Sequence, residues 1–458
     1  MARVAPQGRF SRRVREAREQ GRLVVQPRMG FGDLATMREG LLGVRAADAA
    51  AVGTITLDSY TRVNDHDSAR QALRTGAELN GFPLVAHGPV ATRRLLGEVS
   101  GDGFPVQVRH GSALPYPLFE AMVAAGVDAT EGGPVSYCLP YSRAPISEAV
   151  KAWARCCELI AAQPEPMHLE SFGGCMLGQL CPPSLLVALS VLEALFFREH
   201  GLSDISLSYA QQTHPGQDLE AIAALRRLAG ERLAGADWHV VLYTFMGVFP
   251  RTLVGSFRIL EESVRLAVRS GSERLIVKTP AEAHRIPTIA ENVDALEFAD
   301  AIARDEAGRA ARVSTPAAGS GSGAAHGSGA ESGDEVRATD SGIYEEARML
   351  VDSTLELAPT VGEALIRAFS RGHLDVPYCL HQDNANRSRA YVDPGGMLRW
   401  AEPGRMPLRV DRGGTARRPV SAKGLLGMLG FNERRFDREQ LTHGHFTSRP
   451  SISARSAS

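Results

Sequence analysis

The sequence of 458 residues lacks the features that mark several large classes of protein. It contains no run of about 18 apolar residues, which is the length that a membrane-spanning helix needs. The 51 Lys and Arg residues are balanced by 52 Asp and Glu residues, so the net charge is −1. This balance argues against nucleic acid or an anionic membrane as the main partner.

The six cysteines include no CxxC pair and do not have the spacing of zinc ligands or of a secreted disulfide framework. The basic N-terminal segment, residues 9–22, is not followed by the apolar core of a signal peptide. We therefore expect a cytoplasmic protein with reduced thiols. The basic segment itself is interpreted as a solvated helix or, alternatively, as an arm that docks a partner subunit.

Several catalytic and ligand-binding motifs are also missing. No GxGxxG follows the first apolar run, and the sequence has no Walker loop, no GxSxG elbow and no HExxH. No group of histidines and carboxylates has metal-ligand spacing, so no metal site is expected. These absences remove the support for dinucleotide binding in an open sheet and for the commonest hydrolase classes.

One pattern repeats from residue 22 onward: a short apolar run ends in a polar cluster, and a helical stretch follows it. This alternation predicts parallel βαβ units, in an eight-stranded barrel or in a doubly wound open sheet. An eight-stranded barrel leaves one or two runs to spare, since a tenth occurs at 374–380. The nine other runs are residues 23–28, 54–59, 83–88, 105–111, 128–133, 167–174, 205–211, 239–247 and 275–280.

Composition divides the chain into five expected parts. Residues 313–342 are rich in Ser, Gly and Ala and lack apolar anchors, which is typical of a flexible linker or a surface insertion. The parts are a basic arm (1–21), a catalytic barrel (22–312), this linker (313–342), an extension of helices and loops that packs on the barrel (343–445) and a disordered tail (446–458).

Three arginines lie at or just beyond the ends of different predicted strands: Arg28, Arg62 and Arg109. Because the carboxyl ends of parallel barrel strands meet at one face, we expect the three side chains to converge. Arginine binds carboxylates in two places and stays charged at any working pH, so three of them predict a dicarboxylate ligand. The alternative is that each arginine pairs with a local acid, such as Asp58 or Glu131.

Segment 131–141, EGGPVSYCLPY, begins within the fifth apolar run, residues 128–133. Its glycines let the backbone approach a ligand closely. Glu131 is expected beside the arginines, where positive charge keeps it ionised and able to exchange a proton with an ammonium group. Tyr137 and Tyr141 offer hydroxyl donors. The plain alternative is a Gly-rich turn with two half-buried tyrosines.

Together these clusters resemble the epsilon subunit of glutamate mutase (methylaspartate mutase), in that family's order over roughly residues 22–405. The matching stretches are QPRMG (26–30), TLDSYTR (56–62), LNGFPLVAHG (79–88), VRHG (108–111), EGGPVSYCLPY (131–141), ESFGG (170–174), CPPS (181–184), QDLEAIAALR (217–226), FMGVFP (245–250), VKTPAEA (277–283), IPT (286–288) and LDVPY (374–378).

The resemblance implies a (β/α)8 barrel of the TIM type with a C-terminal α+β extension, which binds glutamate in its mouth. It implies that Arg28, Arg62 and Arg109 grip the two substrate carboxylates, that Glu131 takes the amino group, and that Tyr137 and Tyr141 line the pocket. Residues on the cofactor side are implied to be Gly30, Phe172, Met246, Lys278 and Glu282, the last two being the pair that contacts the adenosyl group.

The activity that the resemblance implies is the radical interconversion of L-glutamate and threo-3-methyl-L-aspartate with adenosylcobalamin. The cofactor is implied to be shared with a separate cobalamin-binding small subunit, in a heterotetramer that contains a homodimer of this chain. Segment 237–242 begins like the DxHxxG signature of cobalamin-binding domains, but Leu242 stands where glycine belongs, so this chain is not expected to carry that domain.

The chain departs from the family mostly on the cofactor side. Pro134 stands where the family usually has a third glycine, and segments 171–180, 243–250 and 380–388 differ from the family's stretches. Two alternatives therefore stay open. One is a non-catalytic paralogue that binds an amino acid. The other is a barrel lyase or aldolase that forms a Schiff base through Lys278 with a dicarboxylate.

Overall fold

The computed structural model describes residues 8–100, 103–172, 180–314, 338–408 and 420–438. Its centre is a sheet of eight parallel strands in the order β1-β8-β7-β6-β5-β4-β3-β2. Strand β1 pairs with β8, and a bridge between Val25 and Ala51 joins β1 to the segment that enters β2. The strands are β1 (Val24–Gln26), β2 (Gly53–Thr56), β3 (Val106–Arg109), β4 (Ala129–Glu131), β5 (His168–Glu170), β6 (Asp204–Ala210), β7 (Asp237–Tyr243) and β8 (Arg274–Ile276).

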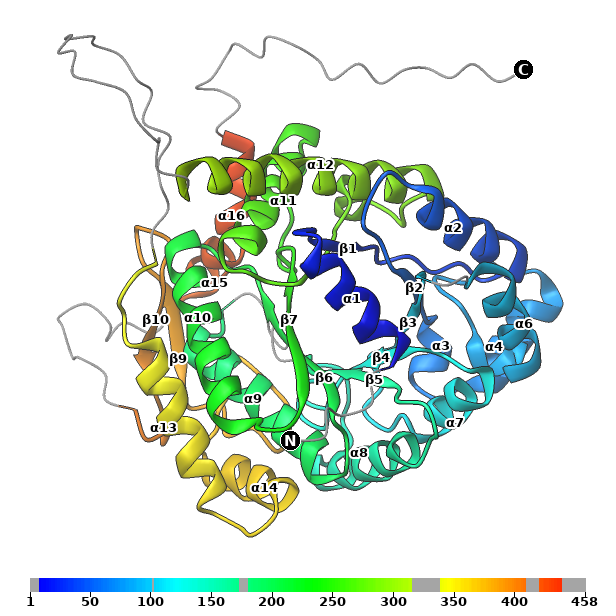
Figure 1. The fold of residues 1–458 in the computed structure, drawn as a ribbon. Helices are drawn as coiled ribbons and strands as arrows, with labels where there is room; N and C mark the ends of the chain where they lie inside the picture. The colour runs from blue at the N-terminus through cyan, green and yellow to red at the C-terminus, as the bar shows by residue number, and fades with distance from the viewer. Residues whose placement is uncertain (1–7, 101–102, 173–179, 315–337, 409–419, 439–458) are drawn as a thin grey trace, which may run out of the picture.

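Helices surround this ring of strands (Figure 1). Strands β2 to β7 each pair with the next strand along the chain, β8 pairs with β1, and the Val25–Ala51 bridge brings the two ends of the sheet together, so the sheet is a (β/α)8 barrel and not a doubly wound open sheet. The surrounding helices are α2 (Leu34–Ala46), α3 (Ser59–Arg62), α4 (His66–Thr75), α5 (Leu84–His87), α6 (Pro89–Val99), α7 (Tyr116–Ala125), α8 (Ile146–Ala161), α9 (Pro183–Glu199), α10 (Pro215–Arg232), α11 (Leu253–Arg269), the 3₁₀ helix η1 (Pro280–Ala283) and α12 (Ile289–Ser314).

Eight of the nine apolar runs predicted as strands form the barrel. The prediction of a strand at the remaining run, residues 83–88, is wrong. That run is helix α5, between Pro83 and Gly88, whose φ is 82°. A run of six residues contains too few positions to separate a strand from a short helix by periodicity. The tenth run, residues 374–380, is loop, and Tyr378 within it has a φ of 60°, which breaks an extended strand.

The barrel interior is polar along much of its length. Alternate residues of a strand point to the same face, so Gln26, Gln107, Glu170 and Arg274 all point inward. They are fully buried and hydrogen-bonded to one another: Gln26 Nε2 donates to Gln107 Oε1 at 2.5 Å, and Arg274 Nη1 to Gln107 Oε1 at 3.2 Å. The interior of such a barrel is more often filled with branched apolar side chains, so a buried polar network here indicates a function beyond packing.

Helix α1 (Arg9–Glu19) lies across the barrel at the amino ends of the strands (Figure 1). Phe10 stacks on His168 with ring centroids 5.1 Å apart, and the guanidinium of Arg274 lies 4.9 Å from the centre of the Phe10 ring. Ser11 Oγ bonds His168 Nδ1 at 3.0 Å. The solvated-helix interpretation thus holds for one face of α1, while the other face closes the barrel base.

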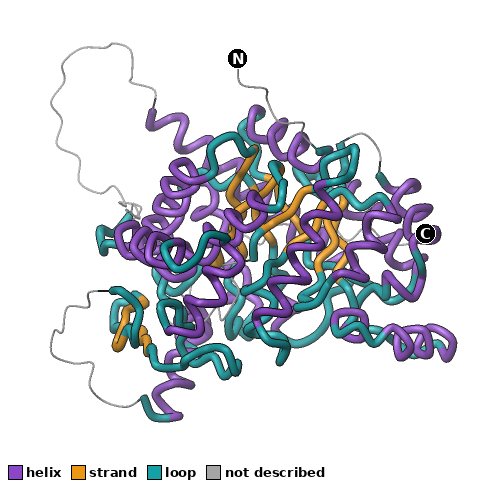
Figure 2. The backbone as a smooth tube through the Cα atoms, turned by 90° about the horizontal axis from the view of Figure 1, so that it is seen from below, coloured by secondary structure: helices purple, strands orange, loops and turns teal. Residues whose placement is uncertain are grey.

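The part of the chain after α12 forms the predicted C-terminal α+β extension (Figure 2). Its hairpin attaches to the barrel helices, since Gln217 Nε2 of α10 donates to Leu398 O at 2.9 Å and Trp400 Nε1 donates to Ser184 Oγ of α9 at 3.3 Å. The elements are α13 (Ile343–Leu355), α14 (Val361–Arg371), the antiparallel strands β9 (Arg389–Val392) and β10 (Leu398–Glu402), α15 (Ala422–Leu429) and α16 (Phe431–Arg438).

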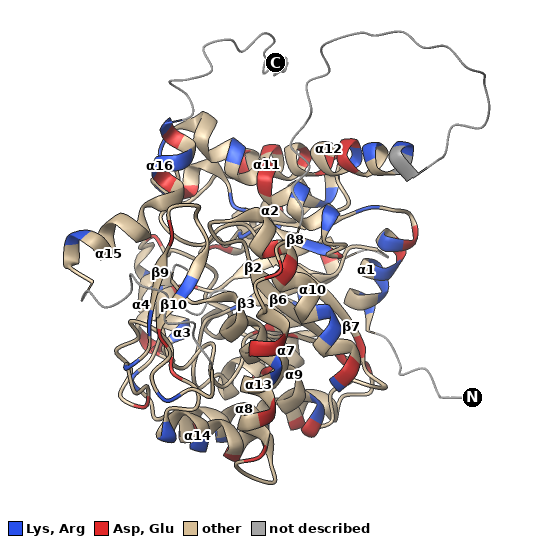
Figure 3. Cartoon of the chain, turned by 90° about the vertical axis from the view of Figure 1, so that its left-hand side faces the viewer, with Lys and Arg blue, Asp and Glu red and all other residues tan. Residues whose placement is uncertain are grey.

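Charged residues of both signs occur along outer helices such as α11, α12 and α16 (Figure 3). Among the described residues, no helix combines the length and the apolar character that crossing a membrane requires. The predicted tail at 446–458, most of the predicted linker at 313–342, and Cys175 lie outside the described residues. The five part boundaries expected from the sequence stay predictions.

Candidate active site

The candidate site lies where the carboxyl ends of the barrel strands meet. Arg109 is the last residue of β3, and Glu131 is the last residue of β4. Arg28 lies two residues beyond β1, Lys278 two residues beyond β8, and Arg62 ends the short helix that follows β2. Five strand ends therefore contribute charged side chains to one face of the barrel, as the sequence predicts for a barrel.

Arg109 and Glu131 form a buried ion pair. Arg109 Nε donates to Glu131 Oε2 at 2.8 Å, and the side chains are 6% and 2% exposed. Burial opposes ionisation of both groups, but each charge stabilises the other. The pKa of Arg109 is therefore raised well above its ordinary value by Glu131, and the pKa of Glu131 lies below its ordinary value because of Arg109. Both groups are ionised at neutral pH.

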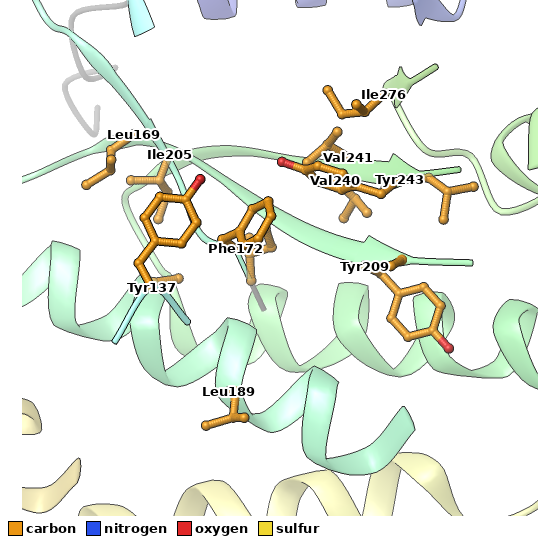
Figure 4. Close-up of a cluster of buried hydrophobic side chains, with 14 of the residues drawn as sticks. Tyr137, Leu169, Phe172, Leu189, Ile205, Tyr209, Val240, Val241, Tyr243 and Ile276 are labelled. Carbon is orange, nitrogen blue, oxygen red and sulfur yellow. The ribbon is translucent and has the colours of Figure 1, made fainter. Parts of the chain in front are cut away.

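Two tyrosines complete the environment of Glu131. Tyr137 donates to Glu131 Oε1 at 2.5 Å, and Tyr243, the last residue of β7, donates to Oε2 at 2.8 Å. Burial first, and then the negative charge of Glu131, raise the pKa of Tyr137 well above its ordinary value, so its hydroxyl stays a donor. Figure 4 shows the hydroxyls of the two tyrosines pointing toward one another, with Phe172 between the rings.

The turn after Glu131 depends on glycine. Gly132 has a φ of 126°, and a Cβ placed on it would lie 2.5 Å from Trp153 Cη2 and 2.5 Å from Tyr137 Cδ2. The next residues are fixed by Glu193 of α9, whose Oε1 accepts from the backbone N–H of Val135 at 3.0 Å. A Cβ on Gly133 would likewise overlap the Glu193 carboxylate, so both glycines of the EGG motif allow close packing of protein side chains around the Tyr137 ring.

We expect Gly132→Ala to lower the free energy of unfolding by about 2–4 kcal/mol, because the new Cβ adds backbone strain and displaces two buried rings. A urea titration measures the change. Gly97→Ala is the matched control, because Gly97 lies inside α6 and a Cβ added to it would have open space within 4 Å, so alanine there adds about 0.5–1 kcal/mol. If the two substitutions lowered the free energy of unfolding equally, the turn after Glu131 would not require glycine at position 132.

Arg62 has no carboxylate partner among the described residues. Its Nε donates to Leu57 O at 2.8 Å. Burial, together with the positive charges of Arg109 and Arg28, lowers the pKa of Arg62 from its ordinary value. Arg62 is thus repelled by Arg109 and by Arg28 and has no counter-ion among the described residues, so an anion bound beside it would relieve electrostatic repulsion.

Arg28 is engaged differently from the other two arginines. Arg28 Nη1 bonds Glu282 Oε2, and the other oxygen of Glu282 accepts from the backbone N–H of Thr279 at 3.0 Å. This ion pair joins a residue predicted to bind substrate to one predicted to bind cofactor. Lys278 is 7% exposed, and its Nζ lies 4.2 Å from the centre of the Phe249 ring.

The remaining predicted residues lie at different depths. Phe172 is buried, with ring centroids 4.8 Å from Tyr137 and 5.3 Å from Tyr243. Tyr141 is 52% exposed at the rim, with its ring 5.9 Å from that of Tyr137. A Cβ on Gly30 would overlap the carbonyl oxygen of Thr56, so this glycine allows close packing against β2. Met246 is half-buried against the main core.

The sequence did not point to Tyr243 or Arg274. Both follow from alternation within their strands: His239, Val241 and Tyr243 share the inward face of β7, while Arg274 and Ile276 share that of β8. Arg274 Nη2 bonds Glu170 Oε2 in the barrel interior, and Tyr243 bonds Glu170 Oε1 as well as Glu131. The signal in the sequence is a polar residue at alternate positions of a buried strand, but it can be used only when the strand register is known.

The fold and the site define a (β/α)8-barrel protein whose strand ends carry three arginines around a buried glutamate. A protein-family model described as methylaspartate mutase E chain (MutE) matches residues 4–313 and 327–426. The chain belongs to this family.

Curated relatives agree with this assignment. The chain is 30% identical over 420 residues to the glutamate mutase epsilon subunit of Yersinia enterocolitica, an alignment that covers 88% of this chain and 82% of the relative. It is 29% identical over 419 residues to the protein of that name from Escherichia coli O157:H7, covering 88% and 82%. It is 30% identical over 416 residues to that from Desulfitobacterium hafniense, covering 87% and 81%.

Proposed function

We propose that this chain is the catalytic subunit of an adenosylcobalamin-dependent glutamate mutase, an isomerase that interconverts L-glutamate and threo-3-methyl-L-aspartate. The observation that carries the proposal is the buried Arg109–Glu131 pair beside Arg62, which has no carboxylate partner among the described residues. An α-amino dicarboxylate supplies what this arrangement needs, which is two negative groups for arginines and one ammonium group for a glutamate.

The arginines hold the substrate by both ends. Arg109 uses Nε for Glu131, and no hydrogen bond from the described residues engages its two Nη groups, which are assigned to one substrate carboxylate. Arg62 and Arg28 are assigned to the other carboxylate. The skeleton rearrangement passes through two separate fragments, so fixed charges that grip each fragment keep them in place until they rejoin.

Glu131 is assigned to the substrate's ammonium group. It is ionised, and its two oxygens are oriented by Arg109 and by the hydroxyls of Tyr137 and Tyr243. In this role Glu131 accepts a proton from the ammonium group while the substrate fragments. The ring of Phe172 excludes water from this part of the site.

Lys278 and Glu282, which are predicted on the cofactor side, and the neighbouring Phe249, which is not, together suit the adenosyl group of adenosylcobalamin. Lys278 offers an ammonium donor, Glu282 offers a carboxylate acceptor, and Phe249 offers an aromatic face, all on the segment after β8 or facing it. This set of donors and acceptors suits the hydroxyls of a ribose. When bound, the cofactor supplies the radical chemistry, which removes a hydrogen atom from the substrate and later returns one.

The proposal includes a partner. The epsilon-subunit name of the relatives indicates that such chains work in a complex. We assign the partner as a cobalamin-binding small subunit, in a cytoplasmic heterotetramer built on a homodimer of this chain.

Binding of L-glutamate tests the proposal first. We expect calorimetry to show that the isolated chain binds L-glutamate at least about 30-fold more tightly than L-glutamine, because the amide removes one charged contact worth about 2 kcal/mol or more. Formation of 3-methylaspartate is then measured with adenosylcobalamin and the small subunit. Binding without turnover would indicate the non-catalytic paralogue, and borohydride trapping at Lys278 would indicate the lyase. Either outcome contradicts the proposal.

A further inference from the structure

The hydroxyl of Tyr243 lies between two buried carboxylates. It is 2.8 Å from Glu131 Oε2, and it also bonds Glu170 Oε1. Glu131 ends β4 and Glu170 ends β5, so the tyrosine, which ends β7, reaches across the barrel to join two neighbouring strand ends. All three residues are fully buried.

The two contacts of Tyr243 contain one proton too few for both to be hydrogen bonds. The phenol has one hydrogen, and an ionised carboxylate only accepts, so the two contacts of Tyr243 share one hydrogen among three oxygens. One contact is therefore a hydrogen bond, and the other brings two oxygens together with no hydrogen between them. One added proton completes both contacts, since a protonated carboxyl donates to the phenol oxygen while the phenol donates to the other carboxylate.

Each carboxylate also accepts from fixed donors other than Tyr243. Glu131 is held by Arg109 at 2.8 Å and by Tyr137, and Glu170 is held by Arg274 and by Gln107 Nε2 at 3.3 Å. Two arginines and two glutamates give a balanced charge. A proton that reaches the unit from a bound ammonium group leaves the net charge of the occupied site unchanged.

We propose that Glu131, Tyr243 and Glu170 act as one proton-accepting unit, in which Tyr243 carries the proton taken by Glu131 onward to Glu170. This inference rests on the proposed function. An N–H bond of the ammonium group breaks as Glu131 gains the proton. Glu131 then gives its proton to the phenol oxygen as the phenol proton moves to Glu170. The substrate ends with a neutral amine and Glu170 ends protonated, and the path reverses when the amine is reprotonated.

The proton-accepting unit gives the polar barrel interior a role and returns Glu131 to its ionised form. The polar network in the barrel interior fixes Glu170, through Arg274, at the distance from which it meets the tyrosine. A second acceptor removes the proton from the substrate's immediate neighbourhood, so Glu131 is again an anion beside Arg109 while the fragments are apart. Tyr243 and Glu170 act through Glu131 and are positioning residues.

Tyr243→Phe tests the inference, because phenylalanine keeps the ring and removes the hydroxyl. In the assembled enzyme with adenosylcobalamin, we expect kcat for L-glutamate to fall about 10- to 100-fold, a smaller loss than removal of a whole acid–base group, and KM to change less than about threefold. Calorimetry on the chain alone should give an L-glutamate affinity within the same threefold.

Tyr209→Phe is the matched control. Tyr209 is a fully buried tyrosine whose hydroxyl donates to a buried carboxylate, Asp218, at 2.7 Å, and it points away from Tyr243 (Figure 4). This variant should keep the wild-type kcat. Tyr243→His is the rescue, because imidazole accepts at one nitrogen and donates at the other, and can therefore join two carboxylates. Its kcat should be at least about threefold higher than that of Tyr243→Phe.

The outcomes separate the two hypotheses. If the wild-type chain fails to bind L-glutamate, the proposed function fails. If the wild type turns over and Tyr243→Phe keeps its kcat as Tyr209→Phe does, the relay fails while the proposed function stands. Equal losses in kcat and affinity, or a Tyr243→His variant no better than Tyr243→Phe, would assign Tyr243 a purely structural role and overturn the inference.

Discussion

Replacing Arg109 with lysine is expected to abolish most of the turnover of the assembled enzyme while leaving the barrel folded. Lysine carries one compact charge on a flexible stem, so it cannot bond Glu131 and grip a substrate carboxylate in two places at once. Loss of a desolvated contact of this kind costs about 2–5 kcal/mol, which corresponds to about a 30- to 5,000-fold fall in kcat/KM. Steady-state kinetics with L-glutamate measures this fall.

The control for this substitution is Arg38→Lys. Arg38 also pairs with a glutamate, Glu98 at 2.6 Å, but it is 46% exposed on the outer face of the barrel. Its replacement should change neither kinetics nor stability measurably. Circular dichroism of Arg109→Lys should match the wild type. Unchanged turnover of a folded Arg109→Lys protein would exclude the three-arginine site.

Glu131→Gln is expected to lower kcat by about 10²- to 10⁴-fold and to weaken L-glutamate binding much less. The amide has nearly the shape of the carboxylate and still accepts hydrogen bonds, but it does not take up a proton. The kcat value reports the reacting complex, and calorimetry with L-glutamate reports binding, so the two measurements separate the roles of this side chain.

A matched variant is Glu273→Gln at the other end of the barrel. Glu273 is also a buried carboxylate held by an arginine, with Arg226 Nη2 at 2.7 Å from its Oε2. Both substitutions leave an arginine without its counter-ion and should lower the melting temperature. Only Glu131→Gln should change kcat. Equal losses of kcat and affinity in Glu131→Gln would make Glu131 a binding group only.

The fold could be predicted to the extent that periodicity and strand–helix alternation reveal it. Eight of the nine strand positions were correct because each apolar run was followed by a helical stretch at regular spacing. Residues 83–88 failed because Pro83 and Gly88 bound a segment too short for its period to be read. The closure of the barrel depends on pairing between β1 and β8, about 250 residues apart, and only the family resemblance had implied it.

In the candidate site, the sequence predicts the charged residues but not the partners that they contact. The sequence alone predicts four of the site residues, because a charged residue at the end of an apolar run can be recognised without a structure. These residues are Arg28, Arg62, Arg109 and Glu131. Their partners could not be predicted, since Arg28 meets Glu282 and Glu131 meets Tyr243 only after the barrel has closed. The interior position of Arg274 likewise depends on which face of β8 points inward, and a shift of one residue reverses that choice.

Helix α1, which covers the base of the barrel, is connected by direct contacts to the candidate site at the mouth. Arg274 lies over the ring of Phe10 on one side and holds Glu170 on the other, and Glu170 meets Tyr243 beneath Glu131. A chain of contacting groups thus runs along the barrel axis from helix α1 to Glu131. In the proposed function the N-terminal helix therefore supports the groups that exchange protons, and a change that loosens its packing is expected to disturb their alignment.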